Sequence, residues 1–164
     1  MTCEAPEEQR PRPEVPRVGV GVLLIDSEDR VLLTLRKRAP EAGRWSIVGG
    51  KVDFLENLEQ SAVREAREEA GVEVELLRLL CLTDHVLPDE AQHWVSPAYL
   101  GRIVGGEPRN CEPDKTQEVK WFALDSVPEN LTMTAQNAIA AYLALGGCGS
   151  GPHAGPPAPR GFSS

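Results

Sequence analysis

The sequence predicts an α/β domain in which a mixed β-sheet is flanked by helices. Short apolar runs bounded by turn-forming residues outnumber helical patterns along residues 17–145, so strands are expected to dominate. One long amphipathic segment, residues 56–70, lies between these runs, as a crossover helix does. The composition, with 41% hydrophobic and 26% charged residues, is typical of a globular domain with one core.

The first part of this domain is expected to contain three strands. Residues 18–26 (VGVGVLLID) form a continuous apolar run, which is typical of a strand buried on both faces. The polar turn at 27–30 leads into a second strand at 31–35, so the two strands are predicted to pair as a hairpin. A short strand at 45–48 ends at two glycines.

The second part begins with the helix at 56–70, which is expected to end at Gly71 because glycine readily adopts the left-handed C-cap conformation. Apolar residues at helical spacing predict a last helix at 134–145. Three further strands are expected between the two helices, at residues 72–82, 93–104 and 118–124.

The two ends of the chain differ from the domain in composition. Residues 1–16 carry four prolines among charged side chains and are expected to be disordered. Residues 146–164 are rich in Gly, Pro and Ser and are expected to form a flexible tail. The four cysteines are scattered, which favours free thiols in a reducing compartment. Without a signal-peptide core or a membrane-length apolar run, a cytoplasmic location is the expectation.

The formal net charge of -8 limits the kinds of partner. An acidic chain is poorly suited to binding a nucleic acid polymer, which needs a basic face, and no segment is expected to bind a membrane. A small anionic substrate remains compatible with this charge, because a bound divalent cation can reverse the local field.

Three glutamates, Glu65, Glu68 and Glu69, share one patch of the predicted helix because they stand three and four residues apart. Like charges at these spacings destabilise an isolated helix by roughly 0.2–0.5 kcal/mol per pair. The patch also lies toward the helix C-terminus, where the helix dipole disfavours acids. Local stability therefore does not explain the cluster, whereas Mg²⁺, which selects hard oxygen ligands, does. The alternative is an ordinary solvated acidic face.

The wider spacing favours the metal. Residues 50–72 fit the pattern G-x5-E-x7-R-E-x-x-E-E-x-G-x, whose fixed positions are Gly50, Glu56, Arg64, Glu65, Glu68, Glu69 and Gly71. At average residue frequencies this match is expected by chance about once in a million chains, and the Glu-rich context weakens that by about tenfold. The pattern is the Nudix box, and the chain resembles the MutT/Nudix hydrolases over most of residues 18–145.

The resemblance implies an α/β/α sandwich in which the box forms a loop, a helix and a second loop. It implies that Glu65, Glu68 and Glu69 hold Mg²⁺ or Mn²⁺ with help from the backbone carbonyl of Gly49. Glu56 and Arg64, with Gly50 and Gly71, are expected to maintain the shape of the box.

A carboxylate is also needed to take a proton from the attacking water. Glu65 is the first candidate for this general base. In this family a glutamate from a later loop is the other choice, and here Glu118 is ranked above Glu112, although an exposed strand-edge position for Glu118 remains open.

Two positions depart from many family members. Val48 replaces a common proline before the two glycines, and Leu55 replaces a common glycine before the first box glutamate. Loss of that glycine removes easy access to positive φ, which makes the loop shape less certain than the helix.

The resemblance implies hydrolysis of a small nucleotide that carries a diphosphate linkage. A nucleoside triphosphate, a deoxynucleoside triphosphate or a damaged nucleotide, cut to the monophosphate and pyrophosphate, is favoured over ADP-ribose or a nucleotide sugar. A nucleotide sensor without activity is a third reading, and a homodimer remains open. Arg36 and Lys37 are candidate phosphate contacts or ordinary surface charge, and Trp94 is a candidate for base stacking or for the core.

Overall fold

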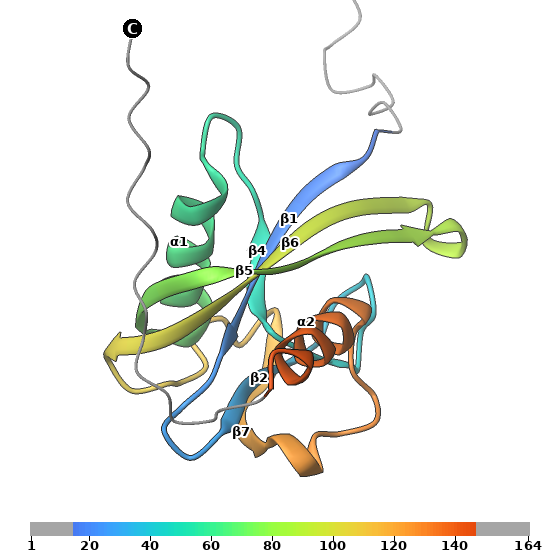
Figure 1. Cartoon of the computed structure of the whole chain (residues 1–164). Coiled ribbons are helices and arrows are strands. Elements are labelled where there is room, and N and C mark those ends of the chain that lie inside the picture. Colours follow the sequence, from blue (N-terminus) through green and yellow to red (C-terminus); the bar gives the residue numbers. More distant parts are fainter. Residues whose placement is uncertain (1–14, 147–164) are drawn as a thin grey trace, which may run out of the picture.

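A computed structural model describes residues 15–146. The predicted tails, 1–16 and 146–164, lie almost wholly outside the described residues. The predicted α/β fold is confirmed, with helices on both sides of a mixed sheet (Figure 1). The elements are β1 (Arg17–Leu24), β2 (Arg30–Arg36), β3 (Trp45–Ser46), β4 (Val48–Lys51), α1 (Leu58–Ala70), β5 (Glu73–Leu87), β6 (Gln92–Gly105), β7 (Thr116–Ala123) and α2 (Met133–Ala144), with short 3₁₀ turns at Pro88–Glu90 and Leu124–Ser126.

The strands form two sheets rather than one. The larger has the order β4-β1-β6-β5, in which β1 is parallel to β6 and the other pairs are antiparallel. The smaller is antiparallel, with the order β3-β2-β7. The predicted hairpin of residues 18–26 and 31–35 is therefore wrong for most of its length. Only a bridge between Ile25 and Val31 joins the two strands before they diverge into separate sheets.

The predicted strand at 45–48 is likewise divided between the sheets. Trp45 pairs with Leu35 of β2, whereas Val48 pairs with Val22 of β1. The change of sheet within four residues carries the chain from the α2 side of the molecule, where Trp45 packs, to the α1 side, where Val48 packs.

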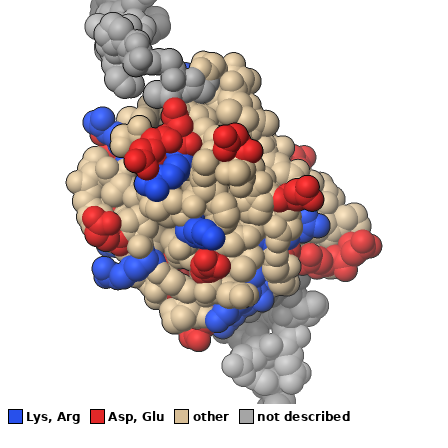
Figure 2. Space-filling model, turned by 90° about the horizontal axis from the view of Figure 1, so that it is seen from below, with Lys and Arg blue, Asp and Glu red and all other residues tan. Residues whose placement is uncertain are grey.

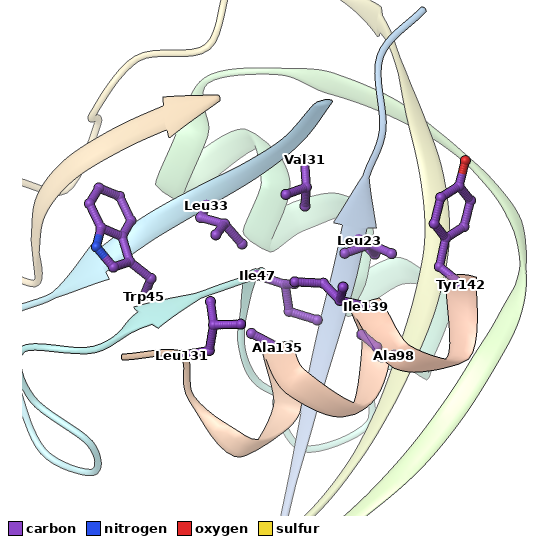
Figure 3. Packing of buried hydrophobic residues seen from close by; sticks show 11 residues of the cluster. Leu23, Val31, Leu33, Trp45, Ile47, Ala98, Leu131, Ala135, Ile139 and Tyr142 are labelled. Atoms are coloured by element: carbon purple, nitrogen blue, oxygen red, sulfur yellow. The ribbon is translucent and has the colours of Figure 1, made fainter. Parts of the chain in front are cut away.

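Alternate residues of β1 pack against opposite helices. Leu23 belongs to the buried cluster around α2, which also contains Ile139 and Tyr142 (Figure 3). Val22 and Leu24 belong to a second cluster with the alanines of α1. This period-two alternation places α1 and α2 on opposite faces of β1, so each helix covers its own side of the larger sheet.

Helix α1 begins at Leu58, two residues later than predicted, because Asn57 caps it. The Asn57 side chain accepts a hydrogen bond from the backbone N–H of Gln60 at 2.8 Å, and the Gln60 side chain accepts one from the N–H of Asn57 at 3.3 Å. Gly71 ends the helix with φ 70°, as predicted. The fully buried stripe Ala62, Ala66 and Ala70 allows close approach to the sheet.

The surface is mixed in charge. Figure 2 shows acidic and basic side chains interspersed on the face seen from below, without a continuous basic stripe. No helix within residues 15–146 is long and apolar enough to cross a membrane. Cys81 and Cys111 are free thiols, as predicted, and the other two cysteines lie outside the described residues.

Candidate active site

A cavity of about 500 Å³ lies beside α1 and β4, and we call it the carboxylate cavity. It brings the three helix glutamates together with one glutamate from the loop before β7 and with several cationic side chains. Its lining residues are Arg36, Arg38, Ala39, Gly49, Gly50, Lys51, Asp53, Arg64, Glu65, Glu68, Glu69, Glu112, Lys115 and Thr116.

Arg64 connects the carboxylates on one side of this cavity. Its Nε and Nη2 donate to the two oxygens of Glu56 at 2.8 and 2.9 Å. Its Nη1 donates to Glu65 at 2.9 Å and to Glu68 at 3.0 Å. The hydrogen bonds from Arg64 hold the pKa of Glu56 at about 2, well below its usual range. Glu56 lies before the helix, in a turn in which its N–H donates to Asp53 at 3.1 Å, so this pair links the loop to α1.

Glu65 lies against the β4 backbone. A side chain on Gly50 would meet both carboxylate oxygens of Glu65 at 2.5 Å, so the approach requires glycine. Glu65 is 9% exposed, and burial raises the pKa of its carboxyl although the Arg64 guanidinium opposes the shift. A carboxyl whose pKa lies above its usual range is suited to exchanging a proton.

Glu69 is the most deeply placed of the three helix glutamates. One of its oxygens accepts from the backbone N–H of Gly49 at 3.0 Å, and the other accepts from the Thr116 hydroxyl at 3.2 Å. Burial raises the pKa of this carboxyl against the opposing effect of these hydrogen bonds. Glu69 therefore ties α1 to both β4 and β7 at the base of the cavity.

The structure brings Glu112, and not Glu118, to this cavity. The loop that carries Glu112 is attached to the end of α1, where the N–H of Cys111 donates to the carbonyl of Glu69 at 3.0 Å. The Glu112 carboxylate accepts from Lys115 at 2.6 Å. Glu118 is an exposed residue of β7, opposite Leu35, and does not line the cavity. The predicted first choice, Glu118, therefore lies outside the cavity, and the second, Glu112, lies in its lining.

The donors in this cavity fit a hard divalent cation, because they are carboxylate and carbonyl oxygens. Within residues 15–146 no group of three or more Asp, Glu, His or Cys side chains is already close enough to hold an ion. The Arg64 Nη1 contacts with Glu65 and Glu68 account for part of this arrangement. An ion bound in the cavity would compete with Arg64 Nη1 for the oxygens of Glu65 and Glu68.

A second cavity, of about 250 Å³, adjoins the first one, and we call it the α2-side cavity. The two cavities share Arg36, Ala39, Gly49, Gly50 and Lys51. Gly19 and Gly21 of β1 line this cavity, and Trp94 of β6 lines it beside them. Of the predicted substrate contacts, Arg36 and Trp94 thus line cavities, whereas Lys37 lines neither and donates to the carbonyl of Pro113 at 2.5 Å.

Comparisons with known proteins identify the family to which this α/β fold belongs. A sequence model described as NUDIX domain matches residues 15–142. The chain belongs to the Nudix hydrolase family, so the resemblance is confirmed. Proteins of this family generally use divalent metal ions.

Solved structures support the same conclusion. The MutT NUDIX hydrolase from Burkholderia pseudomallei is 46% identical, with a TM-score of 0.74 over 77% of this chain and 98% of that one.

Two curated relatives carry different substrate names. The chain is 32% identical over 107 residues to the oxidized purine nucleoside triphosphate hydrolase of Danio rerio, covering 65% of this chain and 67% of that protein. It is 29% identical over 106 residues to the ADP-ribose pyrophosphatase of Methanocaldococcus jannaschii, covering 65% of this chain and 62% of that protein.

Proposed function

We propose that the protein hydrolyses a diphosphate linkage in a nucleoside or deoxynucleoside triphosphate, releasing the monophosphate and pyrophosphate with the help of Mg²⁺ or Mn²⁺. The observation that carries this proposal is the adjoining pair of cavities. One is lined by carboxylates and cations, the other is lined by glycines and Trp94, and they share the edge of β4. A nucleotide has the same two parts, a charged phosphate chain and a flat base.

The helix glutamates Glu65, Glu68 and Glu69 would hold the ion, with the Gly49 carbonyl as a further ligand. A bound divalent cation neutralises phosphate charge and makes water a better nucleophile. Glu65 is the first candidate to take the proton of that water, because it is partly buried and its pKa is raised. Glu112 is the second candidate, since its carboxylate lines the same cavity.

The cationic side chains shared by the cavities would bind the phosphate chain between metal and base. Arg36 is oriented by the hydrogen bond from its Nε to the carbonyl of Pro40 at 2.9 Å, which leaves the terminal nitrogens of the guanidinium for a ligand. Lys51, in β4, lines both cavities. Both would neutralise charge that spreads onto phosphate oxygens during the reaction.

Two relatives support different substrates. The name of the Danio rerio relative supports an oxidised purine triphosphate as the substrate. The name of the Methanocaldococcus jannaschii relative supports ADP-ribose as a second candidate. The triphosphate is preferred because residues 107–122 (EPRNCEPDKTQEVKWF) and the opening run VGVGVLL resemble the small nucleoside-triphosphate pyrophosphatases of the family.

The test is a panel of NTPs, dNTPs, oxidised dNTPs and ADP-ribose, each incubated with Mg²⁺ and the full chain. Pyrophosphate and a monophosphate from a triphosphate are the expected products. AMP and ribose phosphate from ADP-ribose would favour the second candidate. Tight binding without turnover would overturn the enzymatic proposal in favour of a sensor. For substitutions of the cavity glutamates Glu65, Glu68 and Glu69, the matched control is Glu59→Gln, because Glu59 is an exposed α1 glutamate outside the carboxylate cavity.

A further inference from the structure

A buried histidine and a glutamate line the α2-side cavity and do not line the carboxylate cavity. His85 of β5 is 4% exposed, and Glu41 comes from the loop between β2 and β3. The His85 Nδ1 and Glu41 Oε2 atoms are 3.8 Å apart, which is too far for a hydrogen bond. Within residues 15–146 neither ring nitrogen of His85 has a hydrogen-bond partner, and the residue lines the α2-side cavity.

Glu41 is held in place by helix α2. Its Oε1 accepts a hydrogen bond from the backbone N–H of Met133, the first residue of α2, at 3.1 Å. Its backbone adopts φ 57°, in the left-handed region that a non-glycine residue rarely occupies. The carboxylate is thereby fixed with one oxygen bound to the helix and the other facing His85.

His85 lies next to the predicted stacking residue. His85 and Trp94 are directly opposite each other in the β5–β6 ladder, so their side chains share one face of the sheet. A side chain on Gly19 would come within 3.6 Å of the Trp94 ring and 2.7 Å of the Ser96 hydroxyl. Glycine at this position therefore keeps the cavity open at Ser96 and at the edge of the indole, while the Arg17 guanidinium lies over the ring, 5.4 Å from its centroid.

The hydrogen-bonding character of the pair follows from its chemistry. A carboxylate only accepts hydrogen bonds, so the neutral imidazole is expected to carry its proton on Nδ1, toward Glu41. The Nε2 atom is then an acceptor. This end of the cavity offers acceptors, whereas the end shared with the carboxylate cavity carries the donors Arg36 and Lys51.

We propose that Glu41 and His85 determine substrate specificity by accepting hydrogen bonds from an amino-bearing nucleobase that lies beside Trp94, a proposal that rests on the proposed nucleotide hydrolysis. Donors on the base would pair with the Glu41 Oε2 and His85 Nε2 acceptors. A base without such donors would leave the buried His85 and the partly buried Glu41 without these hydrogen bonds. Guanine and adenine present exocyclic amino groups, whereas hypoxanthine and unsubstituted purine do not.

The test uses two nucleotide pairs that each differ by one amino group: GTP with ITP, and ATP with purine riboside triphosphate. In the wild-type protein kcat/KM is expected to favour the amino-bearing member of at least one pair by roughly tenfold or more. Glu41→Gln keeps an acceptor for Met133 but places an NH₂ donor at the cavity, and His85→Phe keeps a ring without nitrogens. Both substitutions are expected to bring the ratio of kcat/KM, amino-bearing nucleotide over its partner, close to one, mainly through a change in KM.

A second histidine provides the matched control. His93 contacts Asp84 at 2.6 Å on the same hairpin but lies outside the cavity. His93→Phe and Asp84→Asn are expected to leave the ratio unchanged. Melting temperatures identify any variant that fails to fold, and Glu41→Gln carries the test if His85→Phe is unstable.

Binding of the corresponding monophosphates, measured by calorimetry, separates this proposal from the proposed activity. If no nucleotide is hydrolysed but GMP or AMP binds at least tenfold more tightly than its partner lacking the amino group, the activity is wrong and the base recognition stands. Ratios near one in the wild-type protein, or ratios unaffected by both substitutions, would overturn the base recognition even if hydrolysis is found.

Discussion

Replacing Gly50 with alanine tests whether the close contact between β4 and Glu65 positions the reactive carboxylate. The added Cβ would lie 2.5 Å from each carboxylate oxygen of Glu65, inside the 3.4 Å at which ordinary contact begins. The obstructed group is the end of a flexible side chain, so the backbone is expected to remain in place. The Glu65 carboxylate must then move by roughly 1 Å.

A displacement of this size costs about 10²-fold in rate when it affects a reacting group. That loss corresponds to about 2.7 kcal/mol of transition-state stabilisation. Fold stability is expected to change far less, because no backbone atom is as close to the new Cβ as these carboxylate atoms.

The assay is kcat for the best triphosphate of the panel, together with the melting temperature of each variant. Gly105→Ala is the control, because a Cβ there would meet only ordinary contacts, the nearest at 3.5 Å. A Gly50→Ala variant with wild-type kcat would show that the position of Glu65 against β4 does not matter for the reaction.

Three further substitutions test other parts of the site. Glu112→Gln should lower kcat by about 10²-fold or more, because it removes a positioned proton acceptor or metal ligand, whereas Glu118→Gln should leave kcat unchanged. Equal effects of the two substitutions in steady-state assays would refute the assignment of Glu112 to the reactive site. Trp94→Ala should raise KM by roughly tenfold with a smaller effect on kcat, since stacking contributes about 1–3 kcal/mol per base; an unchanged KM would place the base elsewhere. Burial raises the pKa of Glu69, so its ionisation destabilises the metal-free fold as pH rises above its unfolded-state pKa and through its higher folded-state pKa. In EDTA, the difference in melting temperature between Glu69→Gln and the wild type, variant minus wild type, should therefore increase from about pH 4 to about pH 7. A difference that does not change with pH would contradict the raised pKa of the buried Glu69 carboxyl.

The box helix was the part of the fold most open to prediction. Its amphipathic pattern and its end at Gly71 depend on local sequence, and the structure has a helix at Leu58–Ala70 with Gly71 as its C-cap. Only the start of the helix was misplaced. The start at Leu58 has a sequence signal, because Asn57 followed three residues later by Gln60 forms a capping box.

The division of strands between two sheets could not be read from the sequence. A continuous apolar run such as β1 shows that both faces are buried, but it carries no information about which strands lie beside it. Loop residues are harder still. Glu112 reaches the cavity because the preceding loop bonds to the end of α1, a tertiary contact without a local pattern. The pair of Glu41 and His85 was missed for the same reason, since only the folded chain brings the two together.

The central claim is that the glutamates of α1 hold a divalent cation, and the most direct test is Mn²⁺ binding measured by electron paramagnetic resonance. The wild-type protein is expected to bind Mn²⁺, Glu65→Gln and Glu68→Gln to bind it at least tenfold more weakly, and Glu59→Gln to match the wild type. Undiminished Mn²⁺ binding in both cavity variants, or none in the wild type with or without nucleotide, would contradict the claim.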